Sequence, residues 1–267
     1  MKNAKRTISL MLAILMTGVA LLAAGCSGGG KTVTVGYTIY EPMNYTDDGG
    51  ELVGFDTELA KKVFEALGYT VVFKEISWDA KYTDLASGNI DCIWNGFTAN
   101  ASDDDGIARS EKVDFSYNYM EKRQVVVAKK DSGIATADDL KGKIGEAESG
   151  SAGETYAKNF EGATVKGVTK QTDALLEVNA GTADFAVLDA QLAKSYCGKG
   201  DYANLAVVEA LSGDVEYYAV GFAKGSELTS AVNEQFEKLA ADGTLASLGE
   251  KYGVRNSVVT DFSDQKK

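Results

Sequence analysis

The sequence predicts an α/β protein of two lobes, and three observations carry this prediction. The chain has 267 residues, which permits one large domain or two modest ones, because a domain usually has roughly 100–200 residues. Short runs of β-branched residues alternate with helical patterns along the chain. One such α/β unit recurs later, which favours two lobes. Hydrophobic residues make up 45% of the chain, ample for a buried core.

The first unit consists of three predicted strands and two helices. Leu59, Val63 and Leu67 recur along one stripe of the first helix, as a period of 3.6 residues requires. Asp56 is expected to cap the start of this helix, and Gly68 suits its left-handed C-terminal position. The predicted strands are residues 33–37, 71–76 and 90–94, and the predicted helices are 57–67 and 79–86.

The second unit repeats this order. Its predicted strands are residues 144–147, 165–168 and 184–188, and its helices are 153–160 and 172–180. In both units a Gly ends a helix, an Asp three residues on opens an apolar strand, and a polar residue follows the strand. That polar residue is Asn95 in the first unit and Asp189 in the second. The alternative is that any two α/β units share such a pattern. Ligands of open α/β sheets bind beyond the carboxyl ends of strands, so the repeat predicts one crevice shared by two lobes.

Two extended segments are predicted to cross between the lobes. The chain leaves the first unit near residues 119–124 and returns through 215–222, which predicts a hinge. Helices are expected at 226–241 and 244–252, and residues 256–267 are expected to form a polar, mobile tail.

The N-terminus has the features of a bacterial lipoprotein signal peptide. Basic residues precede an apolar run at residues 8–24, and small residues stand directly before Cys26. The segment 22–26 resembles a lipobox, so residues 1–25 are predicted to be removed and Cys26 to be lipidated. Residues 26–31 then form a flexible tether. The alternatives are plain secretion and an uncleaved membrane anchor.

Composition excludes several function classes. The chain has no His, which removes the Ser-His-Asp and Cys-His triads and the HExxH zinc motif. The net charge of −12 opposes a nucleic-acid partner, because phosphate binding needs clustered Lys and Arg. Cys92 and Cys197 are predicted to be free thiols, with a disulfide as the alternative. No metal and no cofactor are predicted.

Six motifs, in their order and spacing, resemble the extracytoplasmic solute-binding proteins of ABC importers for polar amino acids. The motifs are residues 52–60, 78–79, 87–91, 95–98, 113–116 and 150–157. The resemblance implies a two-lobed periplasmic-binding-protein-like fold of type II, in which two hinge strands join the α/β lobes and a ligand cleft lies between them. Lobe 1 is then residues 32–121 plus 217–255, and lobe 2 is residues 122–216.

A free amino acid presents a carboxylate and an ammonium, so its site needs a cation with directional donors, an anion and backbone N–H groups. The resemblance assigns Arg109 to the α-carboxylate, where a guanidinium fork binds in bidentate fashion. The alternative for Arg109 is a solvated charge on a helix. The resemblance assigns Asp189 to the α-ammonium; the alternative is an N-cap, and one carboxylate can serve both roles.

Further contacts follow from the same resemblance. The residues expected to line the ligand site from loops of the two lobes are Asn95, Gly96, Thr98, Ser151 and Ala152. Simple turn chemistry is the alternative for the Gly and Ser positions. Tyr40 and Trp78 are expected to form pocket walls, Tyr40 more so than Trp78, although core packing is the alternative for both.

Two departures from the family bear on specificity. The acidic stretch at residues 100–106 replaces the usual sequence before Arg109 and leaves the register of that loop open. Glu148 stands where relatives often carry a neutral or basic residue. A buried carboxylate needs a partner, so Glu148 favours a cationic ligand side chain; the alternatives are a solvent-exposed Glu148, an ion pair with a neighbouring Lys, and a neutral ligand.

The resulting functional hypothesis is a monomeric, lipid-anchored binding protein that closes on a polar amino acid, with a lean toward a basic one, and delivers it to an ABC transporter permease. It is not expected to be an enzyme. The alternatives are a ligand sensor for a signalling partner and a dehydratase-like enzyme on the same fold.

Overall fold

The computed structural model describes residues 30–266. The predicted signal peptide and lipidated Cys26 lie outside these residues, as does most of the tether. From Thr32 onward the chain forms one compact unit. No helix within residues 30–266 combines the length and the apolar character needed to cross a membrane.

The first lobe is built on a five-stranded sheet in the order β4-β1-β5-β14-β6. Its strands are β1 (Lys31–Tyr37), β4 (Tyr69–Glu75), β5 (Cys92–Ile93), β6 (Asp114–Phe115) and β14 (Gly221–Phe222). β5 runs parallel to β1, whereas β14 is antiparallel to both β5 and β6. Because β14 follows the second crossing, the chain returns to the first sheet, which sequence pattern alone could not show. β5 is shorter than the predicted strand at 90–94; beside it, Asp91 N donates to Thr34 O at 2.8 Å and the Asp91 carboxylate accepts from Thr34 N at 2.7 Å.

Helices and two short strands complete this lobe. They are β2 (Tyr45–Thr46), β3 (Leu52–Val53), α2 (Phe55–Ala66), η1 (Trp78–Ala80), α3 (Lys81–Ala86), α4 (Arg109–Lys112), α8 (Leu228–Ala241), α9 (Thr244–Lys251) and η5 (Ser263–Gln265). The prediction that Asp56 caps α2 is wrong, because the helix begins earlier and its N-cap is Gly54 at φ 125°. A Cβ at Gly54 would lie 2.1 Å from the Met43 carbonyl oxygen, so only glycine fits.

The second lobe is built on a sheet in the order β10-β9-β11-β8-β12. β9, β10 and β11 are parallel, as the repeated unit predicts, and β8 is antiparallel to β11. Its elements are β8 (Gln124–Lys129), η2 (Ala137–Leu140), β9 (Ile144–Glu148), α5 (Ala152–Ala157), β10 (Thr164–Val168), α6 (Gln171–Ala180), β11 (Phe185–Asp189), α7 (Ala190–Tyr196), η3 (Gly200–Tyr202), β12 (Leu205–Val207) and η4 (Glu209–Leu211). The helix predicted at 153–160 begins and ends earlier, because the Ser151 side chain caps it.

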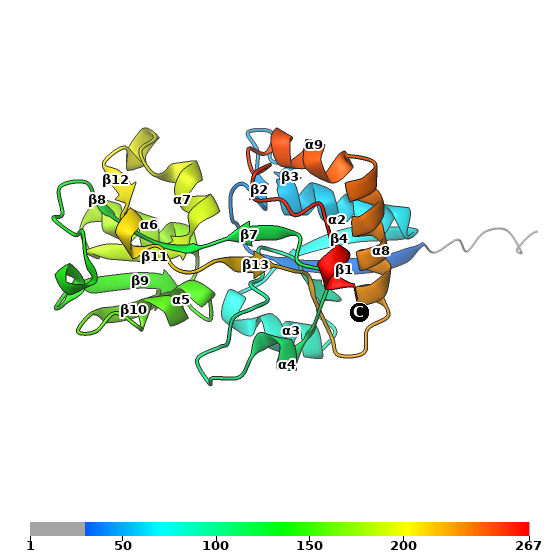
Figure 1. Ribbon diagram of the computed structural model, residues 1–267, viewed down its shortest axis with the longest axis horizontal. Coiled ribbons are helices and arrows are strands. Elements are labelled where there is room, and N and C mark those ends of the chain that lie inside the picture. The colour runs from blue at the N-terminus through cyan, green and yellow to red at the C-terminus, as the bar shows by residue number, and fades with distance from the viewer. Residues whose placement is uncertain (1–29, 267) are drawn as a thin grey trace, which may run out of the picture. The chain divides into compact units, whose positions relative to one another are not determined.

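Two antiparallel strands, β7 (Met120–Lys122) and β13 (Glu216–Tyr218), join the lobes, and Figure 1 shows them between the two sheets. They lie inside the two crossings that the sequence predicted. Glu216 lies directly opposite Lys122, and Tyr218 lies opposite Met120. The hinge therefore brings a charged pair and a tyrosine to the region between the lobes.

The expectation of a mobile tail is wrong for residues 256–266. Glu121 N donates to Ser257 O at 2.7 Å and Val259 N donates to Tyr119 O at 2.9 Å, which fastens the segment along β7. Phe262 is buried and stacks on Tyr117. Composition suggested mobility because the segment is polar, but these few apolar side chains and backbone hydrogen bonds order it.

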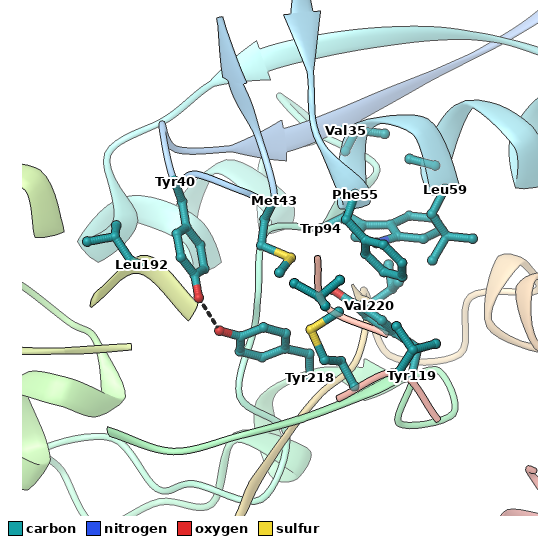
Figure 2. Packing of buried hydrophobic residues seen from close by; sticks show 14 of the residues in the cluster. Val35, Tyr40, Met43, Phe55, Leu59, Trp94, Tyr119, Leu192, Tyr218 and Val220 are labelled. Carbon is teal, nitrogen blue, oxygen red and sulfur yellow. Dashed lines mark hydrogen bonds between the residues drawn. The ribbon is translucent and has the colours of Figure 1, made fainter. Parts of the chain in front are cut away.

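The largest hydrophobic cluster is continuous through the hinge. Figure 2 shows Leu192 of the second lobe beside Tyr40 of the first, with Tyr218 of β13 next to them. Cys92 is buried in this cluster and Cys197 is half-buried; both are free thiols, as predicted.

Candidate functional site

Residues of both lobes and of the hinge line one cavity. Every residue predicted to bind ligand lines it except Tyr40. The lining residues are Trp78, Asn95, Gly96, Thr98, Arg109, Lys122, Gln124, Glu148, Ser151, Ala152, Gly153, Gln171 and Asp189.

Arg109 begins α4 and is 1% exposed. This burial contradicts the alternative of a solvated helix charge. Its Nε donates to Asp103 at 2.8 Å, and its two terminal nitrogens donate to Thr98 O at 3.4 Å and Gly150 O at 3.3 Å. A guanidinium has five N–H donors, so donors remain, and the two long hydrogen bonds to carbonyls can give way to a stronger acceptor.

The acidic loop before Arg109 fixes the orientation of its guanidinium. Asp103 accepts from Arg109 and also from Lys112 Nζ at 2.9 Å, while Asp105 pairs with Lys112 at 2.8 Å. Burial raises the pKa of Asp103, but the hydrogen bond from Lys112 and the charge of Arg109 outweigh it and lower that pKa to about 2. Asp103 is therefore ionised at any physiological pH and holds the fork toward the cavity.

Glu148, at the end of β9, is 3% exposed, so it does not point to solvent. Burial raises the pKa of its carboxyl to about 8, against the charge of Lys81 and a hydrogen bond from Gln171. Lys81 is also buried; its Nζ donates to Gly150 O at 2.9 Å, and burial beside Arg109 lowers the pKa of its ammonium to about 8. At neutral pH the carboxyl of Glu148 is largely protonated, and a cation beside it would ionise it.

The start of α5 faces the same cavity. Ser151 is the N-cap, and its hydroxyl accepts from Glu154 N at 3.0 Å. The first N–H groups of a helix have no acceptor within that helix, and Ala152 and Gly153, the first two residues of α5, line the cavity. Together with Arg109 they form a donor set for an anion.

Asp189 ends β11 and caps α7, as the alternative interpretation predicted: its Oδ1 accepts from Gln191 N at 2.9 Å. Its Oδ2 lies 3.4 Å from Lys122 Nζ and accepts from the Tyr218 hydroxyl. Lys122 also pairs with Glu216 across the hinge. The two carboxylates exceed the single lysine by one negative charge, which leaves this group open to another cation.

The three residues predicted on the first-lobe loop, Asn95, Gly96 and Thr98, all line the cavity, but the side chain of Asn95 is fully engaged within the protein. The Asn95 side chain exchanges hydrogen bonds with Thr38 N, Thr38 Oγ1, Thr38 O and Asn44 Oδ1, which uses every donor and acceptor of its amide. Asn95 therefore supports the loop and has no side-chain group left for a ligand. Thr98 is buried and Gly96, at φ 59°, donates its N–H to Asp56 at 2.8 Å.

Of the two residues predicted to form pocket walls, only Trp78 lines the cavity. Trp78 lines the cavity, with its ring packed edge-on against Phe97. Tyr40 does not line it; its ring belongs to the core, and its hydroxyl lies 2.5 Å from that of Tyr218. The sequence favoured Tyr40 over Trp78, and the structure reverses that order because the short turn after β1 directs Tyr40 toward the hinge.

Sequence reasoning missed Lys122, Gln124, Gly153 and Gln171 as lining residues. Lys122 and Gln124 are two positions apart on the extended crossing, so they share a face. That spacing was a weak signal, because Glu121 and Arg123 alternate with them in the same crossing and no pattern tells the two faces apart. Nothing in the sequence singled out Gln171.

Comparison with known proteins is consistent across sequence and structure. Residues 33–255 match the family described as bacterial extracellular solute-binding proteins, family 3. The chain is 29% identical over 257 residues to the arginine-binding extracellular protein ArtP of Bacillus subtilis (strain 168), covering 93% of this chain and 98% of that protein. It is 32% identical to the L-cystine-binding protein TcyA of the same organism, covering 80% of this chain and 77% of that protein. A solved substrate-binding protein of an ABC uptake transporter from Streptococcus pneumoniae, with bound histidine, superposes with a TM-score of 0.77 at 32% identity, covering 85% and 94% of the two chains.

Proposed function

Since the chain belongs to the bacterial extracellular solute-binding proteins, family 3, we propose that it captures a free polar L-amino acid in the cavity between its lobes and delivers it to the permease of an ABC importer. One observation carries the proposal: Arg109 of the first lobe and Asp189 of the second, a buried cation and a buried anion, line the same cavity. These are the two charges that an α-carboxylate and an α-ammonium require.

The roles of the lining residues follow from their contacts. Arg109 and the N–H groups at the start of α5 bind the α-carboxylate, and Asp189 binds the α-ammonium. Trp78 packs against the aliphatic part of the ligand. The ligand also draws the two lobes together, because its carboxylate and ammonium are held from different lobes.

A basic side chain suits the remaining part of the cavity. Glu148 is buried there, and a guanidinium or ammonium beside it would favour its ionised form. The similarity to an arginine-binding protein over most of the chain supports this choice. The enzyme alternative is not favoured, because the cavity lining offers Glu148 and Asp189 as carboxyl groups, and both have binding roles.

The same proposal includes the parts of the chain around the binding unit. Residues 32–121 plus 217–255 form one lobe and 122–216 the other, and the protein acts as a monomer held to the cell membrane through a lipid on Cys26. Size-exclusion chromatography with light scattering checks the monomer. Release of a Cys26→Ser variant from the membrane fraction would support the anchor, and its retention would contradict it.

The test of the site uses two substitutions and a control. Arg109→Ala and Asp189→Asn should each weaken binding of L-arginine at least about 100-fold by calorimetry, since each removes a charge-assisted contact in a buried site. Asn remains a good helix cap, so α7 should persist. Arg123→Ala, whose guanidinium contacts Gly213 O outside the cavity, is the matched control.

The ligand class is tested by the thermal unfolding of the wild-type protein with L-arginine, L-lysine, L-histidine, L-glutamine and L-cystine. A ligand that binds only the folded state raises the melting temperature. A selective rise with the basic amino acids supports the assignment. A rise with L-glutamine or L-cystine alone would keep the amino-acid site and discard the basic preference.

A further inference from the structure

Two buried tyrosine hydroxyls form a chain that ends on Asp189. The Tyr218 hydroxyl hydrogen-bonds Oδ2 of Asp189, and the Tyr40 hydroxyl lies 2.5 Å from that of Tyr218. Figure 2 shows the Tyr40 and Tyr218 rings approaching each other with their hydroxyls joined. Tyr40 belongs to the first lobe, Tyr218 to the hinge strand β13 and Asp189 to the second lobe. The chain therefore links all three parts of the molecule at the proposed ammonium site.

The direction of the two hydrogen bonds is fixed. The Tyr218 hydroxyl has one proton and donates it to Asp189, so its oxygen accepts from Tyr40. Burial, together with the negative charge of Asp189, raises the pKa of both hydroxyls well above the usual value for tyrosine. Both hydroxyls therefore keep their protons at physiological pH and remain donors.

Packing leaves the two rings little freedom. A Cβ at Gly96 would lie 2.8 Å from Cε1 of Tyr40 and 2.9 Å from Cζ of Tyr218, so the rings fill the space that glycine leaves open. Tyr119 packs on Tyr218 at a ring distance of 6.2 Å. Because the rings are held in this way, the Tyr218 hydroxyl donates its hydrogen bond to Asp189 from a fixed position.

The ammonium of Lys122 lies next to Asp189, so the orientation of the Asp189 carboxylate affects how strongly the two groups pair. Lys122 Nζ lies 3.4 Å from Oδ2, longer than a charge-assisted hydrogen bond of about 2.8 Å. Its closer partner is Glu216. Without the Tyr218 hydrogen bond, the ion pair between Asp189 and Lys122 would shorten, and the tighter pair would compete with a ligand ammonium for Oδ2.

We propose that Tyr218 is a positioning residue for ligand binding, which keeps the Asp189 carboxylate from closing further on its ion-pair partner Lys122 and holds it toward the cavity, and that Tyr40 fixes Tyr218 in turn. The inference rests on the proposed role of Asp189. It adds two residues that do not line the cavity and that act on the ligand only through that carboxylate.

The test is a double-mutant cycle between Tyr218→Phe and Asp189→Asn, read by calorimetry with L-arginine, L-histidine and L-glutamine, which share the α-ammonium. Tyr218→Phe should weaken binding about 10-fold, the effect of one hydrogen bond to a charged group. In the Asp189→Asn background the same substitution should change affinity less than about twofold, because there is no anion left to position. Tyr40→Phe should show a smaller loss with the same dependence on Asp189.

A matched control separates positioning from general destabilisation. Tyr156→Phe removes a tyrosine hydroxyl that donates to Leu211 O at 3.2 Å within the second lobe, and it should leave affinity unchanged. Losses from Tyr218→Phe and Asp189→Asn that simply add would overturn the inference, as would wild-type affinity in Tyr218→Phe. If Tyr218→Phe does not fold, Tyr40→Phe carries the same cycle. Wild-type affinity in Asp189→Asn would instead remove Asp189 from the site, and with it the proposed function of that residue.

Discussion

At the scale of single residues, burial changes what Glu148 can do. Its position at the end of the largely buried strand β9 places a carboxyl in the cavity, where loss of water raises its pKa to about 8. The charged groups around it are Lys81 and Lys170, which favour the ionised form, and Asp173, which opposes it. From the sequence, Glu148 is expected to carry a negative charge at neutral pH, but its buried carboxyl is largely protonated there.

This burial predicts a pH-dependent affinity for a cationic ligand. A cation binds the ionised form of Glu148, so below pH 8 binding must first displace a proton. Affinity for L-arginine should therefore rise about tenfold per pH unit from pH 6 to 8 and level off above, whereas affinity for L-glutamine should stay flat. Calorimetry across this range measures both slopes.

The variant Glu148→Gln separates the contribution of Glu148 to this pH dependence from that of Lys81, whose pKa is also about 8. Glu148→Gln should remove most of the rise of L-arginine affinity with pH, and it should weaken binding of L-arginine far more than binding of L-glutamine. Glu146→Gln, on the same strand but outside the cavity lining, is the control. Equal losses for both ligands in Glu148→Gln would remove Glu148 as the selector.

Arg109 and Asp189 show how far a residue-level prediction can reach. The resemblance of the motifs to a known family named both as ligand contacts, and both line the cavity with the two charges that a zwitterion requires. The same reasoning placed Asn95 in the site, where the structure shows its amide fully used by Thr38 and Asn44. Residue type predicts what a side chain can bind, whereas its neighbours decide whether it is available.

At the scale of elements, the C-terminal segment is a structural part of the first lobe. Phe262 is buried and stacks on Phe236 at a ring distance of 6.0 Å, and Gln265 accepts from Asn118 N at 2.6 Å. Phe262→Ala should lower the free energy of unfolding by about 3–5 kcal/mol, the usual cost of removing a buried ring. Chemical denaturation measures this. Ser263→Ala, at an exposed neighbour, should change it by less than about 0.5 kcal/mol, and a mobile tail would give the same small value for both.

At the scale of the whole molecule, ion pairs fasten the two lobes to each other beside the cavity. Asp104 of the acidic loop pairs with Lys158 and accepts from Thr155 Oγ1 at 3.2 Å. Both partners belong to the second lobe: Thr155 lies in α5, and Lys158 directly follows this helix. Glu75 of β4 pairs with Lys170 at 2.6 Å. Such contacts exist only when the lobes are together, so they favour the form that holds a ligand.

The acidic loop supplies its own control for this closure. Asp104 crosses to the second lobe, while the neighbouring Asp105 pairs with Lys112 inside the first. Asp104→Asn should weaken ligand binding by up to about fivefold and reduce its salt dependence, since exposed pairs contribute up to about 1 kcal/mol. Asp105→Asn should leave affinity unchanged although it removes the same charge. Equal effects of the two variants would mean that net charge, and not the contact between lobes, matters.

The sequence by itself determined the α/β architecture and the two crossings, because hydrophobic period and helix-ending glycines are local properties. Most of the lining residues followed from the resemblance of its motifs to a known family. Only the tertiary structure decided the return of β14 to the first sheet and the ordering of residues 256–266. It also decided that Trp78 lines the cavity and Tyr40 does not. It also decided the contact of Tyr218 with Asp189 and the burial of Glu148. Each of these depends on which distant segments meet. Packing between segments far apart in the chain sets hydrogen-bond partners and solvent access, and no local pattern encodes them.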